Sequence, residues 1–157
     1  MLNNIDPQGM GRVQVAVPVI QRRGSSAWAL PCVPIAGAQA GIYLVPPVGA
    51  SVWVEFEEGD PDQPIWVGGF WASGADVPPE AGAGVPGSPS IVLRTTAQNA
   101  VVISDLPGPA GGIMLRSTTG ATILVNDAGI SISNGKGASI TMSGPTVSIN
   151  NGALVVD

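Results

Sequence analysis

From Ser90 onward the chain repeats a short pattern in which two aliphatic residues are separated by a single residue and followed by a turn. Residues two apart point to the same side of a β-strand, so each pair places both side chains on one face. Gly, Asn, Asp and Pro interrupt the pattern about every seven to ten residues, which leaves no room for helices. The pattern predicts eight short strands, with the aliphatic pairs Ile91/Leu93, Val101/Ile103, Ile113/Leu115, Ile123/Val125, Ile130/Ile132, Ile140/Met142, Val147/Ile149 and Leu154/Val156.

The first half of the chain also has strand patterns, but the residues that separate its strands differ from those of the second half. Val13, Val15 and Val17 alternate with other residues between Gly11 and Pro18, as in a half-buried strand. Four further strands are predicted at Trp28–Pro34, Gly41–Val45, Ser51–Phe56 and Pro64–Gly68. Five short strands without a helical period favour a small closed or nearly closed β-barrel, of which the five-stranded oligonucleotide- and oligosaccharide-binding (OB) barrel is a common form.

Composition divides the 157 residues into two parts. Every aromatic residue precedes residue 72, so the second half must fill its interior with aliphatic side chains. The segment 74–89 between the halves is rich in Pro and Gly, as exposed connectors are. We therefore predict a barrel at 1–73, a linker at 74–89 and a β-helical spike at 90–157.

A single sheet built from the eight pairs would leave an apolar face and open edges in water. A one-chain parallel β-helix needs about twenty residues or more per turn, so this segment would give only about three turns. Three chains wound together would instead bring their inward residues together on a shared axis and leave edges only at the ends. We predict a homotrimer whose second half forms an intertwined triple-stranded β-helix.

Part of the first half resembles a known family. The residues that carry the likeness are Gly11–Pro18, Trp28–Cys32 and, most specifically, Val48–Gly69. They resemble the OB barrel of phage baseplate central spikes (baseplate assembly protein V-like), of type VI valine-glycine-repeat spikes and of the spikes of extracellular contractile injection particles. These families commonly follow the barrel with a triple-stranded β-helix that pierces a membrane.

The resemblance implies a structural spike of a contractile injection machine. The barrels would be held by a baseplate hub protein, the needle would contact the target membrane transiently, and the particle would be a phage virion or a phage-tail-like injection particle. Related spikes often carry a His-x-His iron site at the tip, but this chain has no histidine. A separate PAAR-like tip protein is therefore expected at Leu154, Val155, Val156 and Asp157. The expected trimer axis consists of Ile113, Leu115, Ile123, Val125, Ile130, Ile132, Ile140, Met142, Val147 and Ile149.

Charge and residue types narrow the function further. A net charge of −5 repels phosphate backbones, so nucleic acid is not an expected partner. The absence of histidine removes the usual general base and the commonest transition-metal ligand. We predict no catalytic residue, no cofactor and no metal site. The start of the chain lacks the basic residues and apolar run of a signal peptide, so synthesis in the cytoplasm is expected. Cys32, among apolar neighbours, is expected to be buried.

Two other functions fit parts of the sequence. In the first, a carbohydrate-binding module on a β-repeat stalk, Trp28, Trp53, Trp66 or Trp71 would stack on sugar rings. In the second, a β-helical polysaccharide enzyme, the sparse charged residues Asp105, Arg116, Asp127 and Lys136 would have to cluster on one face. The acidic group Glu55, Glu57, Glu58, Asp60 and Asp62 could suggest a carboxylate pair or a calcium site, but strand and turn roles explain these residues more simply.

Overall fold

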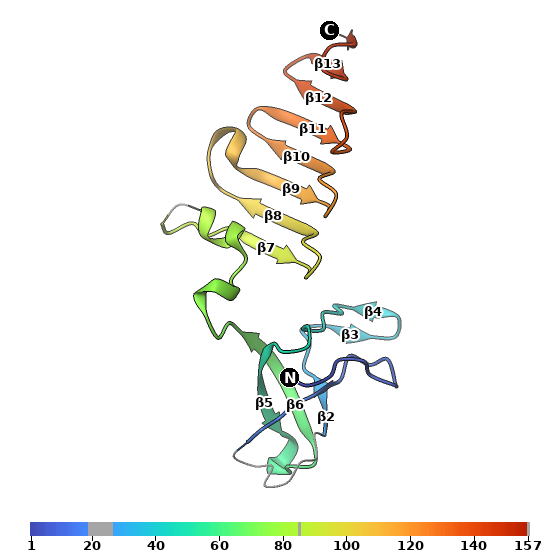
Figure 1. The fold of residues 1–157 in the computed structure, drawn as a ribbon, viewed down its shortest axis with the longest axis vertical. Coiled ribbons are helices and arrows are strands. Elements are labelled where there is room, and N and C mark those ends of the chain that lie inside the picture. The colour runs from blue at the N-terminus through green and yellow to red at the C-terminus, as the bar shows by residue number, and fades with distance from the viewer. Residues whose placement is uncertain (19–26, 85, 157) are drawn as a thin grey trace. The chain divides into compact units, whose positions relative to one another are not determined.

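The structure is a computed structural model that describes residues 1–18, 27–84 and 86–156 (Figure 1). The chain forms two compact units, Met1–Asp76 and Val77–Asp157, and the division lies within the Pro- and Gly-rich segment 74–89. Strands and short 3-10 helices make up the regular structure of the described ranges, and this confirms the all-β prediction. Across those ranges no helix has both the length and the apolar character needed to span a membrane.

The first unit contains a four-stranded sheet and a separate two-stranded pair. The sheet has the order β1-β2-β6-β5, in which β2 and β6 are parallel and the other neighbours antiparallel. Its strands are β1 (Val13–Gln14), β2 (Trp28–Pro31), β5 (Ser51–Phe56) and β6 (Pro64–Phe70). The pair consists of β3 (Ala36–Gly37) and β4 (Ala40–Gly41).

The β5–β6 hairpin agrees most closely with its predicted strands. Val52, Val54 and Phe56 are half-buried, whereas Trp53 and Glu55 are exposed, as the alternation predicts. A register shift between Trp53 and Val54 interrupts the pairing with β6. The 3-10 helix η1 (Glu57–Gly59) and a turn then lead back to Pro64, where β6 begins.

Two predictions for the first unit are wrong. The segment Gly41–Val45 is not a strand beyond Gly41, and Tyr43 and Leu44 are 69% and 61% exposed. The prolines at 46 and 47 have no backbone N–H to continue a ladder, and in this stretch a short apolar run bounded by turn residues was insufficient to define a strand. Cys32 is exposed rather than buried, because it lies just beyond the end of β2, held by a backbone bond from its N–H to the Trp66 carbonyl (2.9 Å).

The core of the first unit is small. Its buried residues are Val13, Val15, Ala29 and Trp66, and Val52 and Val54 of β5 pack against them. The indole N–H of Trp66 donates to the Gly11 carbonyl at 3.2 Å, which satisfies the polar atom of the largest buried side chain. The sheet is thereby tied to the segment that leads into β1.

The second unit is one antiparallel meander. Each strand is hydrogen-bonded to the strands before and after it in the chain, and Figure 1 shows them stacked like the rungs of a ladder. Eight strands were predicted, and each pair falls within one of the following: β7 (Ile91–Arg94), β8 (Ala100–Ser104), β9 (Gly112–Arg116), β10 (Thr122–Asn126), β11 (Gly129–Ser133), β12 (Ser139–Ser143), β13 (Thr146–Ile149) and β14 (Leu154–Val156).

Glycines at strand starts permit this close stacking. Gly112, which begins β9, has φ +92°, and a Cβ atom built on it would lie 2.0 Å from the Val125 carbonyl oxygen. Gly129, which begins β11, has φ +132°, and its Cβ would lie 2.0 Å from the Met142 carbonyl oxygen. Both the backbone angle and the space therefore require glycine at these positions.

Three further 3-10 helices flank the strands. They are η2 (Gly74–Asp76), η3 (Pro79–Ala83) and η4 (Gly108–Ala110). Segment η3 lies in the predicted linker yet packs on β7 of the second unit, and η4 packs on β10. Part of the connector thus belongs structurally to the strand run.

Candidate functional site

The register of the meander places all sixteen aliphatic residues of the eight pairs on one side of the sheet, which we call the front face. Residues directly opposite each other on neighbouring strands share a face, and the pairings join end to end without a break. The first column is Ile91, Ile103, Ile113, Val125, Ile130, Met142, Val147 and Val156. The second column is Leu93, Val101, Leu115, Ile123, Ile132, Ile140, Ile149 and Leu154.

This front face is uncovered in the single chain. Ile91 is 62% exposed, Ile113 48% and Ile132 38%, although each is flanked by aliphatic neighbours along its column. A continuous aliphatic surface of this length in water is unfavourable, and such surfaces in folded proteins are usually interaction sites.

The opposite side of the sheet, the reverse face, has a different character. Its central column begins with Val92, Val102, Met114 and Leu124, then changes to Ser131, Thr141 and Ser148. Ala100 and Val102, the buried hydrophobic residues of the described part of this unit, both lie on the reverse face. The two faces therefore differ. Segments of the same chain cover part of the reverse face, whereas the front face is uncovered.

All ten residues expected on the trimer axis lie in the two front-face columns. The structure brings them together on one surface, while their position on a threefold axis stays a prediction. Of the expected tip contacts, Leu154 and Val156 extend the same two columns and are 54% and 56% exposed. Only the backbone of Val155 is described, where it pairs with Ser148, and Asp157 lies outside the described residues.

Comparison with known families explains both units. Residues 2–71 match the type VI secretion system/phage-baseplate injector OB domain, and residues 90–155 match the phage baseplate V C-terminal trimerisation domain. The chain belongs to the phage baseplate V family. The resemblance drawn from the barrel residues is thereby confirmed, and so is the two-part architecture of an OB domain followed by a trimerisation domain. No curated protein matches the chain.

Membership of the phage baseplate V family fixes the general role. The chain is a baseplate spike protein, a structural component of a phage or injection particle and not an enzyme. Every front-face residue except Val156 lies within the residues matched to the trimerisation domain, which supports a homotrimer. Intertwining of the three chains remains a prediction, since within one chain each strand pairs with its own neighbours in sequence.

Three of the four charged residues considered for an enzyme have structural partners in this spike protein. Asp127 accepts the Gly108 N–H at 3.0 Å, Asp105 accepts the Ser88 hydroxyl at 2.7 Å, and Arg116 is paired with Glu80. In the acidic group of the first unit, Asp60 accepts the Asp62 N–H at 2.9 Å and so shapes the turn before β6. Among the residues that the structure describes, no cluster of His, Cys, Asp or Glu could hold a metal ion.

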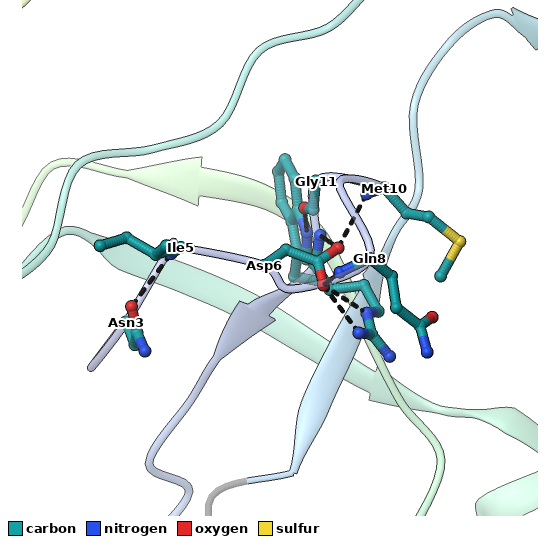
Figure 2. Close-up of polar contacts among 8 residues, drawn as sticks. Asn3, Ile5, Asp6, Gln8, Met10 and Gly11 are labelled. Atoms are coloured by element: carbon teal, nitrogen blue, oxygen red, sulfur yellow. Dashed lines mark hydrogen bonds and ion pairs between the residues drawn. The ribbon is translucent and has the colours of Figure 1, made fainter.

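A polar constellation around Asp6 in the OB domain was not predicted from the sequence. Figure 2 shows the Asp6 carboxylate facing the loop that carries Gln8 and Met10. One oxygen accepts the Gln8 N–H (3.0 Å) and both Nε and Nη2 of Arg12 (3.0 and 2.7 Å); the other accepts the N–H groups of Met10 (2.8 Å) and Arg12 (3.2 Å). The Asp6 side chain is 2% exposed, and the Arg12 guanidinium lies 5.5 Å from the centre of the Trp28 ring.

These bonds order the chain before β1. The Arg12 guanidinium, reinforced by the backbone N–H groups, holds the pKa of the Asp6 carboxyl well below its usual range. The only sequence signal is a pair of opposite charges six residues apart in a chain where 11% of residues are charged. The constellation contains no open donor set for a ligand, so we interpret it as structural.

Replacing Asp6 with asparagine is expected to lower the melting temperature (Tm) of the OB domain at neutral pH. Because the folded-state pKa is lowered, the carboxylate stabilises the fold above its unfolded-state pKa of about 3.9, and this contribution disappears as the pH falls below that value. The difference in Tm between wild type and Asp6→Asn should therefore be large at neutral pH and shrink steadily under acid. Tryptophan fluorescence reports this domain alone, since every tryptophan precedes residue 72. A Tm difference that is the same at pH values on both sides of about 3.9 would contradict the assignment.

Proposed function

We propose that three copies of this chain form the central spike of a contractile injection machine, with the front faces of β7–β14 turned towards a common axis. The observation that carries the proposal is the pair of unbroken aliphatic columns. Most of their residues are exposed in one chain, and all but Val156 lie in the segment matched as a trimerisation domain.

Threefold closure is the arrangement that suits this surface. Three sheets with their front faces inward bury all six columns in one dry interior, and each sheet keeps its reverse face towards water. Two sheets packed face to face would also cover the columns, and in either arrangement the edge strands β7 and β14 are exposed only at the two ends of the stack. Three copies are preferred because the segment matches a trimerisation domain.

The shaft is short and stiff. Eight strands stacked at about 4.8 Å each give a length on the order of 40 Å. Bending it requires many backbone pairings and aliphatic contacts to break together, which is the mechanical property needed to pierce a target envelope when a sheath contracts. A net charge of −5 per chain keeps such a particle soluble before firing.

The two ends of the spike serve different partners in this proposal. The OB domains are held by a baseplate hub protein, in keeping with the match to an injector OB domain. The aliphatic columns continue to the last described strand at Leu154 and Val156, so the distal end presents an apolar surface that suits a PAAR-like cap. Contact with the target membrane is transient, and nucleic acid is not a partner of this acidic surface.

The carbohydrate-binding alternative has less support. Of its four tryptophans, Trp66 is 7% exposed and bonded to Gly11, and Trp28 lies beneath Arg12. Trp66 is therefore part of the core of the OB domain, and the Trp28 ring is already in contact with Arg12. Trp53 and Trp71 are exposed, but the Trp53 ring packs against Phe70 in a tilted arrangement, with ring centres 4.8 Å apart, rather than standing alone.

The spike function is tested by the mass and detergent resistance of the full chain. Light scattering should give three times the chain mass of 15.7 kDa. The trimer should also migrate intact in SDS without heating and dissociate only on boiling, because its apolar interior opens slowly. A stable monomer in light scattering would overturn the proposal.

A further inference from the structure

Over β7–β13, the central column of the reverse face is apolar only where other parts of the same chain cover it. This column is aliphatic from Val92 to Leu124, over β7–β10, and polar from Ser131 onward, over β11–β13. Segment η3 packs on β7 and η4 packs on β10, so the two covers are found over the aliphatic stretch. Beyond it, Thr141 in the same column is exposed.

Glu80 fixes the first of these covers. Glu80 lies in η3, and each of its carboxylate oxygens binds an arginine of a different strand. Oε2 accepts a hydrogen bond from Nη1 of Arg94 on β7 at 2.6 Å, and Oε1 accepts one from Nη2 of Arg116 on β9. Arg94 and Arg116 are the register partners of Ala100 on β8, so the carboxylate spans three strands above a buried alanine.

The electrostatic setting of Glu80 is consistent with a tight anchor. Its side chain is 15% exposed, and those of Arg94 and Arg116 are 18% and 32% exposed. Its own backbone N–H, together with the two guanidinium groups, lowers the pKa of the Glu80 carboxyl, so the group is charged at neutral pH.

The second cover is anchored by β10 and the turn after it. The Asp127 carboxylate accepts the Gly108 N–H at 3.0 Å, and the Asn126 side-chain amide donates to the Pro109 carbonyl at 3.2 Å. Asp105, just after β8, accepts the hydroxyl of Ser88 at 2.7 Å and so ties the end of the connector to the strand run. The connector and the η4 loop are thus each bound to the strand run by side-chain hydrogen bonds.

We propose that η3 and η4 form a collar that closes the reverse face of β7–β10, so that only the front face is open to other copies, with Glu80 as its positioning residue. The inference rests on the proposed trimer, because it states which face the trimer uses. It also divides the shaft into a part with a collar, over β7–β10, and a part without one, in which Thr141 is exposed and Ser131 and Ser148 are half-buried.

The collar is tested by the reactivity of single cysteines in the full-length trimer. Cys32 is first replaced by serine, because it is exposed and would react. Cysteine is then introduced separately at Val102, beneath the collar, at Thr141, on the bare reverse face, and at Ile132, on the front face. Each variant is checked for its trimeric mass by light scattering and treated with a maleimide.

We expect a clear order of maleimide reaction rates among the three cysteine variants. Val102→Cys and Ile132→Cys should both react at least about tenfold more slowly than Thr141→Cys, because covered thiols are reached only through local opening. Adding Glu80→Gln should speed the reaction of Val102→Cys at least about threefold and leave Ile132→Cys unchanged, since the front face does not depend on the collar. Glu58→Gln, which removes an exposed carboxylate of the other unit, is the matched control and should change neither rate.

The possible failures are distinguishable. If Val102→Cys reacts as fast as Thr141→Cys in an intact trimer, the collar does not exist. If Glu80→Gln leaves the slow reaction of Val102→Cys unchanged, Glu80 does not position the cover. If Ile132→Cys reacts fast, the front face is not the trimer interface, and the proposed function fails whatever the collar does.

Discussion

The Ile132→Asp variant is expected to be unable to form the trimer. Ile132 lies in the middle of the second column, opposite Ile123 and Ile140, and is 38% exposed in the single chain. In the proposed assembly three aspartates would meet in an apolar interior, where each unpaired charge costs several kcal/mol. Light scattering should therefore show monomers or aggregates in place of the trimer.

Thr141→Asp is the matched control for this prediction. Thr141 lies on β12, next to the residue that pairs with Ile132, but on the reverse face and exposed. The same charge placed there should leave the trimer intact. Because a slip of one residue exchanges the two faces of a strand, opposite results, with Thr141→Asp disruptive and Ile132→Asp tolerated, would show that the inward face is assigned the wrong way round.

Trp66→Ala is expected to destabilise the OB domain by about 3–5 kcal/mol, the usual cost of truncating a buried aromatic side chain. Trp66 is the largest member of a four-residue buried core and also loses its bond to Gly11. That loss is comparable with the whole stability of many small domains, about 5–15 kcal/mol. Fluorescence of the remaining tryptophans should show a much earlier thermal transition, while the shaft stays trimeric in light scattering.

Trp71→Ala supplies the comparison, because Trp71 is 62% exposed. Truncation there should change the stability of the OB domain by about 0.5 kcal/mol or less, as for most surface substitutions. Equal losses in Trp66→Ala and Trp71→Ala would contradict the assignment of Trp66 as the core residue.

The shaft was predictable because one local signal determines it. Period-two pairs separated by turns specify which residues are strands and which side each faces, and the register then aligned every pair, from Ile91 to Val156, in two columns. The β5–β6 hairpin was predictable for the same reason. Its alternation is strong, and the acidic turn at Asp60 leads into β6 at Pro64.

The collar could not be read from the sequence. Glu80 is 14 residues from Arg94 and 36 from Arg116, and neither separation has a periodic signal. The connector is rich in Pro and Gly, a composition typical of an exposed linker, so its sequence does not indicate the 3-10 helix η3. The reverse face does contain one sequence signal, because aliphatic residues such as Met114 and Leu124 are followed by Ser131. This change can be recognised only after the register has placed these residues in one column.

The errors in the first unit have a related cause. A short apolar run around Tyr43 suggested a strand, but a strand also requires a hydrogen-bonded partner, and the adjoining prolines have no backbone N–H to donate. Apolar neighbours suggested that Cys32 is buried, although burial depends on where β2 ends and not on local composition. In both places tertiary packing, and not the local sequence pattern, determines whether a residue forms a strand or is buried.

The inward orientation of the front face is tested most directly by the position of Ile132 in an experimental structure of the full-length assembly. We expect three chains with their Ile132 side chains converging on the threefold axis, in mutual contact at roughly 4 Å. A structure in which Ile132 faces water, or in which the axis is lined by the reverse-face column through Thr141, would contradict it.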